Sequence, residues 1–306
     1  MLIIGENIHI IAPKVKEAIE NREAKFLQDL ARRQVRNGAH VVDLNIGPQK
    51  KQGVAVMEWL VDAIQEAVDV PLSLDTTNAA AIEAGLKRCQ KQAWINSTSA
   101  DPARMEALFP LAAQYNAKII ALAMEKGGIS PTADGRVQIA MEMLIPKAME
   151  YGVPMENLYL DPLTLTVNGM QDQVAATLEG VRMFKQLADP PPQTVVGLSN
   201  VSNSCPDTGR SLINRTFLVM LLGAGLDSAI ADPLDKKQNE VIRIVERRDT
   251  STGLGRLLVA LHDATQNMED LDPGIVDMND HEQVKVWKTY QVLKNQIIYA
   301  HSYLRI

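Results

Sequence analysis

The chain has 306 residues, a length that allows either two average domains or one large α/β barrel. Hydrophobic residues make up 46% and charged residues 22% of it, which is typical of a folded protein and excludes a disordered or fibrous one. The formal charge is −6, and no block of basic residues occurs. Nucleic acid is therefore disfavoured as the main partner, because phosphate contacts need clustered lysine and arginine side chains.

Neither a membrane span nor a secretory leader is expected from the apolar segments. The longest of them, Phe217 to Leu226, has about half of the roughly 20 residues that a membrane-spanning helix needs. The amino-terminal segment has no basic leader, and Glu6 interrupts its apolar run. Cys89 and Cys205 cannot make a disulfide framework. We therefore expect a cytoplasmic protein.

Motifs for metals and nucleotides are missing from the sequence. The five histidines never fall at the helical spacings that build zinc sites, and neither cysteine has a near partner, so we expect no metal site in this chain. Gly253 and Gly255 begin a dinucleotide-binding pattern, but Leu258 stands where the third glycine should be. No phosphate-binding loop of the Walker type occurs.

Eight short apolar runs alternate with amphipathic segments along the chain. Strands are expected at Leu2–Gly5, His40–Leu44, Pro71–Leu74, Ala93–Ile95, Ala117–Ala123, Asn157–Leu160, Thr194–Leu198 and Asp227–Ala231. Helical patterns between them include Phe26–Asn37, Val54–Val68, Ala79–Gln90, Met105–Tyr115, Val137–Tyr151 and Gln173–Leu187. Eight such units over about 230 residues predict an α/β fold of the (β/α)₈ type, a TIM barrel. A doubly wound sheet is the alternative, but it normally has fewer strands and a glycine-rich first turn.

The segment after the eighth strand departs from this rhythm. Helical patterns at Gln238–Arg248 and Leu254–Met268 precede an acidic stretch from Glu269 to Glu282. We interpret this part as an elaboration of the last βα unit, because it is too short to bury a core of its own. The expected organisation is one domain over residues 1–306, with a barrel core at 1–235, an extension at about 240–285 and a closing helix at 284–303.

Polar residues directly follow the predicted strands, at the end of a barrel where the chemistry normally lies. They are Glu6, Asp43, Asn45, Asp75, Asn96, Asp161, Ser199, Asn200 and Asp232. Any one of them is equally explained as a helix N-cap. The set adjoins the strands directly, however, whereas caps usually sit a residue or more beyond. Acidic and amide groups without a nucleophile–base pair suit a nitrogen-rich ligand that donates hydrogen bonds.

At these strand ends the sequence resembles the pterin-binding methyltransferases, which transfer the N5-methyl group of methyltetrahydrofolate to a corrinoid. The matching segments are MLIIGE, DLNIGP, MEWL, LDTTN, INST, LYLDPL, GLSNVS, LINRTFL and IADP, which run in order through residues 1 to about 235. The sequence is most similar to the free-standing enzymes of acetogenic and demethylating anaerobes and is also similar to the folate module of cobalamin-dependent methionine synthase. The resemblance implies a TIM barrel, usually a homodimer.

The resemblance also implies roles for individual residues. Asp75, Asn96 and Asp161 are implied to hold the pterin ring, whose 2-amino-4-oxo edge offers adjacent N–H groups to a carboxylate. Asn200 matches the asparagine that reaches N5 of the folate. Further substrate-binding positions implied by the match are Glu6, Gly197, Ser199, Asn203 and Arg210, with Met124 in a lid segment that matches more loosely. The sequence departs from the family at Asn7 and His9, and the resemblance gives no role to residues 240–285.

The implied reaction moves a methyl group between N5 and Co(I) in anaerobic one-carbon metabolism, in the acetyl-CoA pathway or in O-demethylation. An amine anion is a poor leaving group, so N5 needs a proton or a strong hydrogen bond as its bond to carbon breaks. Asn200 can donate to neutral N5 or accept from protonated N5. Two alternatives are a dihydropteroate synthase-like enzyme, which would show basic residues at strands 7 and 8, and a non-catalytic folate-binding protein.

The corrinoid is expected to belong to a separate corrinoid protein. Corrinoid modules of this type carry an Asp-x-His-x-x-Gly motif, and none of the five histidines lies in that pattern. The roughly 70 residues after the barrel are too few for a Rossmann-like corrinoid domain.

Overall fold

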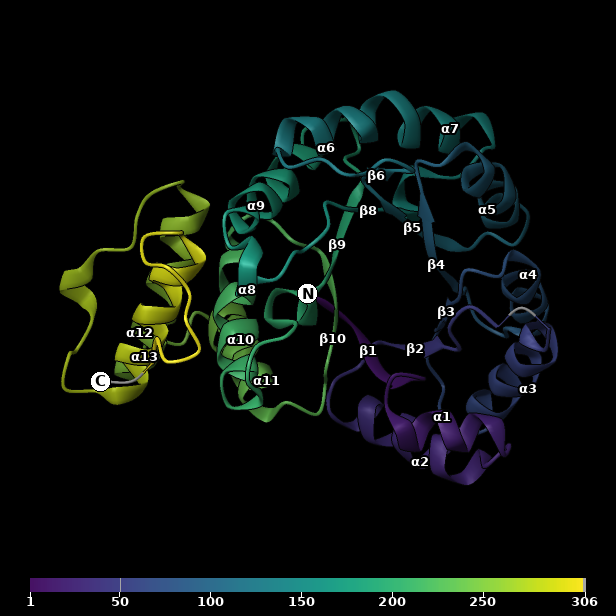
Figure 1. Cartoon of the computed structure of the whole chain (residues 1–306), viewed down its shortest axis with the longest axis horizontal. Helices are drawn as coiled ribbons and strands as arrows, with labels where there is room; N and C mark the ends of the chain where they lie inside the picture. The colour runs from purple at the N-terminus through teal and green to yellow at the C-terminus, as the bar shows by residue number, and fades with distance from the viewer. Residues whose placement is uncertain (50, 305–306) are drawn as a thin grey trace.

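Eight parallel strands form a closed barrel in the computed structural model, which describes residues 1–49 and 51–304 (Figure 1). The strands are β1 (Leu2–His9), β2 (Val41–Asn45), β3 (Leu72–Asp75), β4 (Trp94–Ser99), β5 (Lys118–Leu122), β8 (Leu158–Asp161), β9 (Gln193–Gly197) and β10 (Ser228–Ala231). β1 pairs with β2 on one side and with β10 on the other, which closes the sheet. The predicted TIM barrel is confirmed. Only position 50 and residues 305–306 of the expected single domain lie outside the described residues.

Helices surround the barrel on the outside (Figure 1). In chain order they are α1 (Pro13–Glu20), α2 (Ala24–Arg36), α3 (Gly53–Gln65), α4 (Ala79–Arg88), α5 (Pro102–Gln114), α6 (Ala133–Ile139), α7 (Ile145–Glu150), α8 (Val167–Met170), α9 (Gln173–Phe184), α10 (Asp207–Gly223) and α11 (Lys236–Arg247). The apolar stretch that begins at Phe217 is the buried second half of α10. Among the described residues, no helix has both the length and the apolar character that crossing a membrane requires.

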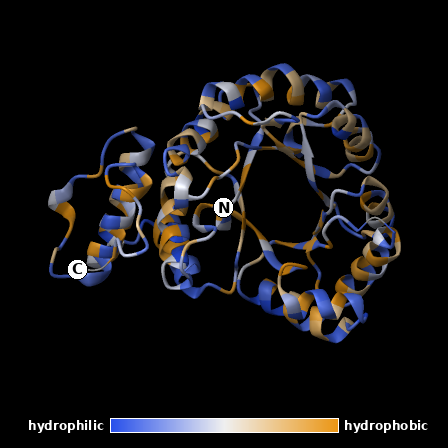
Figure 2. Cartoon of the chain, viewed as in Figure 1, coloured by the Kyte–Doolittle hydropathy of each residue, from blue (hydrophilic) through white to orange (hydrophobic). Residues whose placement is uncertain are grey.

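The strands are buried on both faces, which explains why they read as nearly continuous apolar runs. The barrel interior is filled by side chains from six strands, namely Ile4, Val41, Trp94, Ile120, Tyr159 and Val195. Figure 2 shows hydrophobic residues along the strands and on the sides of the helices that face them. The packed interior leaves the carboxyl ends of the strands as the place where polar side chains can gather.

Three local elements differ from the expected pattern. β1 continues to His9 instead of ending at Gly5, with an irregular register between Gly5 and Ile8. Its polar residues Glu6 and Asn7 had the appearance of a loop. The predicted helix at 137–151 is α6 and α7 joined by a π-helical turn, η1 (Ala140–Leu144). A small hairpin of β6 (Met124–Glu125) and β7 (Gly128–Ile129) precedes α6.

The carboxyl-terminal extension packs beside the barrel, against the outer side of α10 (Figure 1). It contains α12 (Gly253–Gln266) and α13 (His281–Leu293). Their apolar side chains, including Leu257, Leu261 and Tyr290, share one core with Phe217 of α10. A Cβ atom on Gly223 would lie 2.4 Å from the carbonyl oxygen of His262, so α10 and α12 approach as closely as only glycine permits.

The last helix was predicted over 284–303, and this prediction is wrong at its carboxyl end. α13 ends at Leu293, because Asn295 adopts a left-handed conformation with φ of 56°. The N–H of Gln296 then donates to the carbonyl of Gln291, and that of Asn295 to Val292, which is a Schellman ending. Asparagine tolerates this conformation better than other residues that have a side chain. The rest of the described chain follows in turns.

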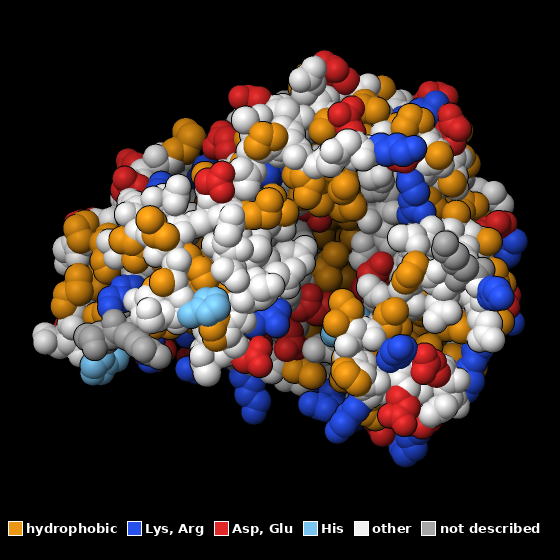
Figure 3. Space-filling view, viewed as in Figure 1, with side chains coloured by type: hydrophobic (Ala, Val, Ile, Leu, Met, Phe, Trp, Pro, Cys, Tyr) orange, Lys and Arg blue, Asp and Glu red, His pale blue; other side chains and the backbone are white. Residues whose placement is uncertain are grey.

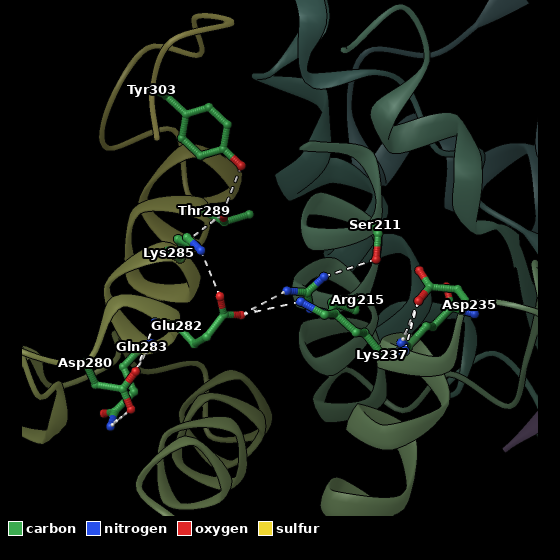
Figure 4. Close-up of polar contacts among 11 residues, drawn as sticks. Ser211, Arg215, Asp235, Lys237, Asp280, Glu282, Gln283, Lys285, Thr289 and Tyr303 are labelled. Atoms are coloured by element: carbon green, nitrogen blue, oxygen red, sulfur yellow. Dashed lines mark hydrogen bonds and ion pairs between the residues drawn. The ribbon is translucent and has the colours of Figure 1, made fainter. Parts of the chain in front are cut away.

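An ionic contact attaches the extension to the barrel helices (Figure 4). Arg215 of α10, which is 8% exposed, donates to Ser211 at 3.1 Å and lies 3.6 Å from a carboxylate oxygen of Glu282 in α13. Glu282 also pairs with Lys285 at 2.8 Å and lies 3.9 Å from Lys237 of α11. A single carboxylate therefore links α13 to two helices of the barrel.

Candidate functional site

A cavity of about 580 Å³ opens at the carboxyl ends of the strands. Figure 3 shows the surface hollowed at the middle of the barrel, with acidic side chains beside the opening. Nine of the ten predicted site residues line this cavity: Glu6, Asp75, Asn96, Asp161, Gly197, Ser199, Asn200, Asn203 and Arg210. These residues come from five of the eight strands or the segments after them. The fold thus gathers polar groups that lie far apart in the sequence.

A second cavity, of about 650 Å³, lies near the other end of the barrel between α2 and α11. It is lined by Met1 and Ile3 at the start of β1 and by exposed side chains such as Arg36 and Arg243. Active sites of TIM barrels lie at the carboxyl ends of the strands. We therefore place the functional site in the cavity that contains the buried carboxylates.

Two of these carboxylates, Asp43 and Asp75, form one hydrogen-bonded group with their neighbours. Ser73 donates to Asp43 at 2.6 Å, Asn96 donates to the same oxygen at 3.2 Å, and Asn45 donates to Asp75. Burial raises the pKa of both carboxyl groups, and the charge of Asp43 raises that of Asp75 further. The pair consequently holds a proton more tightly than exposed aspartates do, and it can accept hydrogen bonds from a ligand when ionised.

Asp161 lies at the end of β8 and is 5% exposed. Its side chain accepts a hydrogen bond of 2.7 Å from the N–H of Leu163. Burial raises the pKa of Asp161 to about 7, against the opposing effects of this hydrogen bond and of the charge on Arg136. A group at this pKa is easily ionised when a ligand donates N–H groups to it.

The end of β1 contributes a second acidic region. Ser199 donates a short hydrogen bond to Glu6, and burial raises the pKa of Glu6 to about 7. Asn7 donates to Asp232, after β10, at 2.9 Å. These contacts join strands β1, β9 and β10, so the first and last parts of the barrel share one polar network.

Asn200 and its neighbours lie on η3 (Leu198–Ser202) and in the turn after it. Asn203 donates to the carbonyl oxygen of the Asn200 side chain at 3.3 Å, and Arg210 donates to Ser202 at 3.3 Å. A Cβ atom on Gly197 would lie 2.9 Å from the amide nitrogen of Asn200. Glycine at this position therefore leaves room for the exposed Asn200 side chain to lie over the end of β9.

Met124 is the predicted site residue that does not line the cavity. It lies in β6, half-buried, where its backbone carbonyl accepts the N–H of Ala100. Conversely, the cavity lining includes Asn45, His9 and Leu163, which were not predicted as site residues. Asn45 carried a signal as a residue directly after a strand, but His9 and Leu163 carried none, because they lie beyond the expected strand ends.

The buried carboxyl groups predict a pH-dependent stability. In the folded, ligand-free protein Asp161 keeps its proton up to about pH 7, whereas an unfolded aspartate releases it near 3.8. The folded state then binds more protons, so the free energy of unfolding falls as the pH rises between these values. Asp161→Asn removes this contribution. Between about pH 5 and about pH 8, the free energy of unfolding of the variant should therefore fall by on the order of 2 kcal/mol less than that of the wild type.

Urea unfolding at a series of pH values checks this expectation. Asp263→Asn is the matched control, because Arg248 holds the pKa of Asp263 at about 2 and the group is ionised throughout this range. Equal pH slopes for Asp161→Asn and the wild type would contradict a raised pKa at Asp161.

The sequence matches a known protein family and two characterised kinds of enzyme. A family model described as "Pterin binding enzyme" matches residues 14–232. The chain is 30% identical to the methylcorrinoid:tetrahydrofolate methyltransferase of Eubacterium limosum over 241 residues, which are 77% of this chain and 86% of that protein. It is 31% identical to the methionine synthase of Mycobacterium tuberculosis over 240 residues, but these cover only 20% of that enzyme.

Solved structures show the same architecture at low identity. The dihydropteroate synthase of Yersinia pestis aligns with a TM-score of 0.56 and 17% identity, over 81% of this chain and 94% of that one. The dihydropteroate synthase of Thermus thermophilus aligns with a TM-score of 0.55 and 18% identity, over 80% of this chain and 93% of that one. These likenesses concern the fold. The sequence matches confirm the resemblance seen at the strand ends, and the chain belongs to the family of pterin-binding enzymes.

Proposed function

We propose that this protein is a methyltransferase that moves the N5-methyl group between methyltetrahydrofolate and the Co(I) corrinoid of a separate corrinoid protein. The observation that carries the proposal is one cavity lined by Asp75, Asn96 and Asp161 together with Asn200. The first three match the family's pterin-holding positions, and Asn200 matches the position that reaches N5. The sequence similarity to a methylcorrinoid:tetrahydrofolate methyltransferase supports the same conclusion.

The buried acidic groups suit the pterin ring. Its 2-amino-4-oxo edge presents adjacent N–H donors, and an ionised carboxylate accepts such a pair at two oxygens. Asp161 and the Asp43–Asp75 pair have raised pKa values in the ligand-free protein, so their ionisation carries a desolvation cost. Hydrogen bonds from a bound pterin offset this cost, which makes the cavity selective for a ligand that donates.

Asn200 supplies the group that responds to the charge at N5. Its amide can donate to neutral N5, and its carbonyl can accept from protonated N5, so one side chain suits both states of the leaving amine. The Co(I) centre supplies the nucleophile that takes the methyl group. Because Asn200 is exposed at the cavity opening, a corrinoid brought by another protein can approach the methyl group there.

The alternatives are less well supported by the cavity. A dihydropteroate synthase-like enzyme would show basic residues at strands 7 and 8 of the barrel. The lining holds the carboxyl groups of Glu6, Asp43, Asp75 and Asp161, whereas Arg210 is its one lysine or arginine among the described residues. Burial lowers the pKa of His9 and so favours its neutral form. A folate-binding protein without catalysis has no need of Asn200 at N5, and measurements of turnover distinguish it.

The proposal also includes a pathway, a cellular location, an oligomeric state and the place where the corrinoid protein binds. We propose an anaerobic role in the acetyl-CoA pathway or in O-demethylation, a cytoplasmic location and a homodimer. The corrinoid partner would meet the barrel at the carboxyl ends of the strands. The extension of α12 and α13 lies beside α10, away from the barrel axis (Figure 1).

A test follows from the requirement for a separate corrinoid. The purified protein is expected to be colourless, and it should demethylate methyltetrahydrofolate only when Co(I) cobalamin or a reduced corrinoid protein is added. Cobalt analysis and the absorbance of methylcobalt against Co(I) check both parts. Stoichiometric cobalt in the pure protein, or demethylation without added corrinoid, would overturn the proposal.

A further inference from the structure

Arg136 is the most deeply buried cation near the cavity, yet it does not line it. Its side chain lies in α6 and has no solvent exposure. Among the described residues it forms no ion pair with a carboxylate. Burying a guanidinium group is costly unless its donors are satisfied, so the partners of its hydrogen bonds show what this residue holds in place.

All of its hydrogen bonds go to neutral oxygens, and they join four segments. Nε donates to the carbonyl of Ser130 at 2.9 Å, just after β7. One terminal nitrogen donates to the carbonyls of Pro162 and Leu163, each at 3.0 Å. That nitrogen also lies 3.3 Å from the hydroxyl of Thr177, and the other donates to Gln173 at 3.0 Å, both in α9. Arg136 thus fixes the loop after β8 against α6 and α9.

This loop determines the orientation of Asp161. Leu163 has a φ of 70°, a left-handed conformation that a leucine adopts only when its surroundings hold it there. Arg136 and Thr177 both donate to its carbonyl oxygen. Its N–H donates to Asp161 at 2.7 Å. The guanidinium therefore holds the turn that directs this N–H at the carboxylate.

Arg136 also acts on Asp161 through its charge. Burial raises the pKa of Asp161, while the Leu163 hydrogen bond and the positive charge of Arg136 both lower it. No carboxylate pairs with this charge among the described residues, so the field of Arg136 is not cancelled by a closer anion. A fixed turn and a nearby cation together favour the ionised form that accepts hydrogen bonds from a pterin.

We propose that Arg136 is a positioning residue for Asp161: it holds the carbonyls of Pro162 and Leu163 so that the Leu163 N–H fixes the carboxylate in the orientation that receives the pterin. The inference rests on the proposed function for the identity of the ligand. The hold of Arg136 on the Leu163 turn and on Asp161 does not depend on which ligand binds.

Arg136→Gln and Arg136→Lys test the inference by calorimetry with methyltetrahydrofolate over a range of pH. Arg136→Gln should bind the folate about 10- to 100-fold more weakly, because charge-assisted hydrogen bonds that hold the turn are lost. The pH at which affinity falls off on the acid side should also move upward. Arg136→Lys keeps the charge without the fork of donors, so it should lose affinity with a smaller shift of this pH.

Two controls separate this role from a general loss of stability. Arg215→Gln removes another buried arginine, which contacts Ser211 and Glu282 and no cavity residue. It should lower the unfolding midpoint and leave folate affinity and its pH profile unchanged. In the Asp161→Ala background, Arg136→Gln should change affinity by less than about 3-fold, because its effect passes through Asp161.

The inference is overturned if Arg136→Gln, or Arg136→Lys where the glutamine variant does not fold, binds the folate with wild-type affinity and pH profile. Fully additive losses with Asp161→Ala would overturn it as well. The titration of Asp161 in the ligand-free protein, followed by NMR of its carboxyl carbon, gives a readout without folate. If the wild type binds no folate, the proposed function fails, and an unchanged Asp161 titration in Arg136→Gln then decides against the inference.

Discussion

Asp75→Ala and Asp161→Ala are each expected to weaken methyltetrahydrofolate binding by on the order of 1–3 kcal/mol or more, because pterin N–H groups lose their acceptors in a closed site. The loss should be larger at Asp161, which is 5% exposed and whose pKa is not shifted by any second carboxylate among the described residues. Asp43 lies close enough to Asp75 to raise its pKa, so this neighbour can accept part of the hydrogen bonding when Asp75 is removed. Asp75→Ala should therefore lose less folate affinity than Asp161→Ala.

Calorimetry with methyltetrahydrofolate measures this effect, and Asp263→Ala serves as the matched control. Asp263 is an aspartate of α12 that pairs with Arg248, and it does not line the cavity. The control should retain wild-type affinity. Unchanged affinity in both cavity variants would remove these carboxylates from the pterin site.

Asn200→Ala is expected to lower the methyl-transfer rate more than the folate affinity. If the hydrogen bond to N5 strengthens only as the amine departs, its loss raises the barrier and leaves the ground state nearly unchanged. Removing one such hydrogen-bonding group from an active site costs on the order of 100-fold in rate. The exposed position of Asn200 makes a large effect on stability unexpected.

Single-turnover transfer to Co(I) cobalamin, measured beside folate binding, separates the two quantities. Asn203→Ala is an informative comparison: the Asn203 amide donates to the Asn200 side chain, so its removal acts on N5 through Asn200 and should give a smaller loss of rate. A wild-type transfer rate in Asn200→Ala would rule out its catalytic role and favour a folate-binding protein without catalysis.

The barrel could be predicted from the sequence because its strands are buried on both faces. Segments such as Leu72–Asp75 and Leu158–Asp161 are short and buried almost throughout, and amphipathic helices separate them. The ends of strands and helices were harder to predict where single residues departed from the apolar or amphipathic pattern. The polar residues Glu6 and Asn7 hid the second half of β1, and the left-handed Asn295 ended α13 inside an amphipathic pattern.

The residues of the site that directly follow strands could be predicted from the sequence, but the contacts among them could not. Side chains directly after parallel strands converge at one end of the barrel, which is why nine predicted residues line one cavity. The contacts among them depend on register and twist, which the sequence does not encode locally. The Asp43–Asp75 pair, the β1 contact of Glu6 with Ser199 and the support of Asp161 by Arg136 join residues up to 193 positions apart.

The most direct measurement of the proposed function is a single turnover of the wild-type protein with methyltetrahydrofolate labelled at its N5-methyl carbon and with Co(I) cobalamin. We expect the label to appear on cobalt as methylcobalamin, in amounts equal to the tetrahydrofolate formed, and only when the protein is present. If the protein binds the labelled folate but the label stays on N5 while Co(I) persists, the proposed methyl transfer is contradicted.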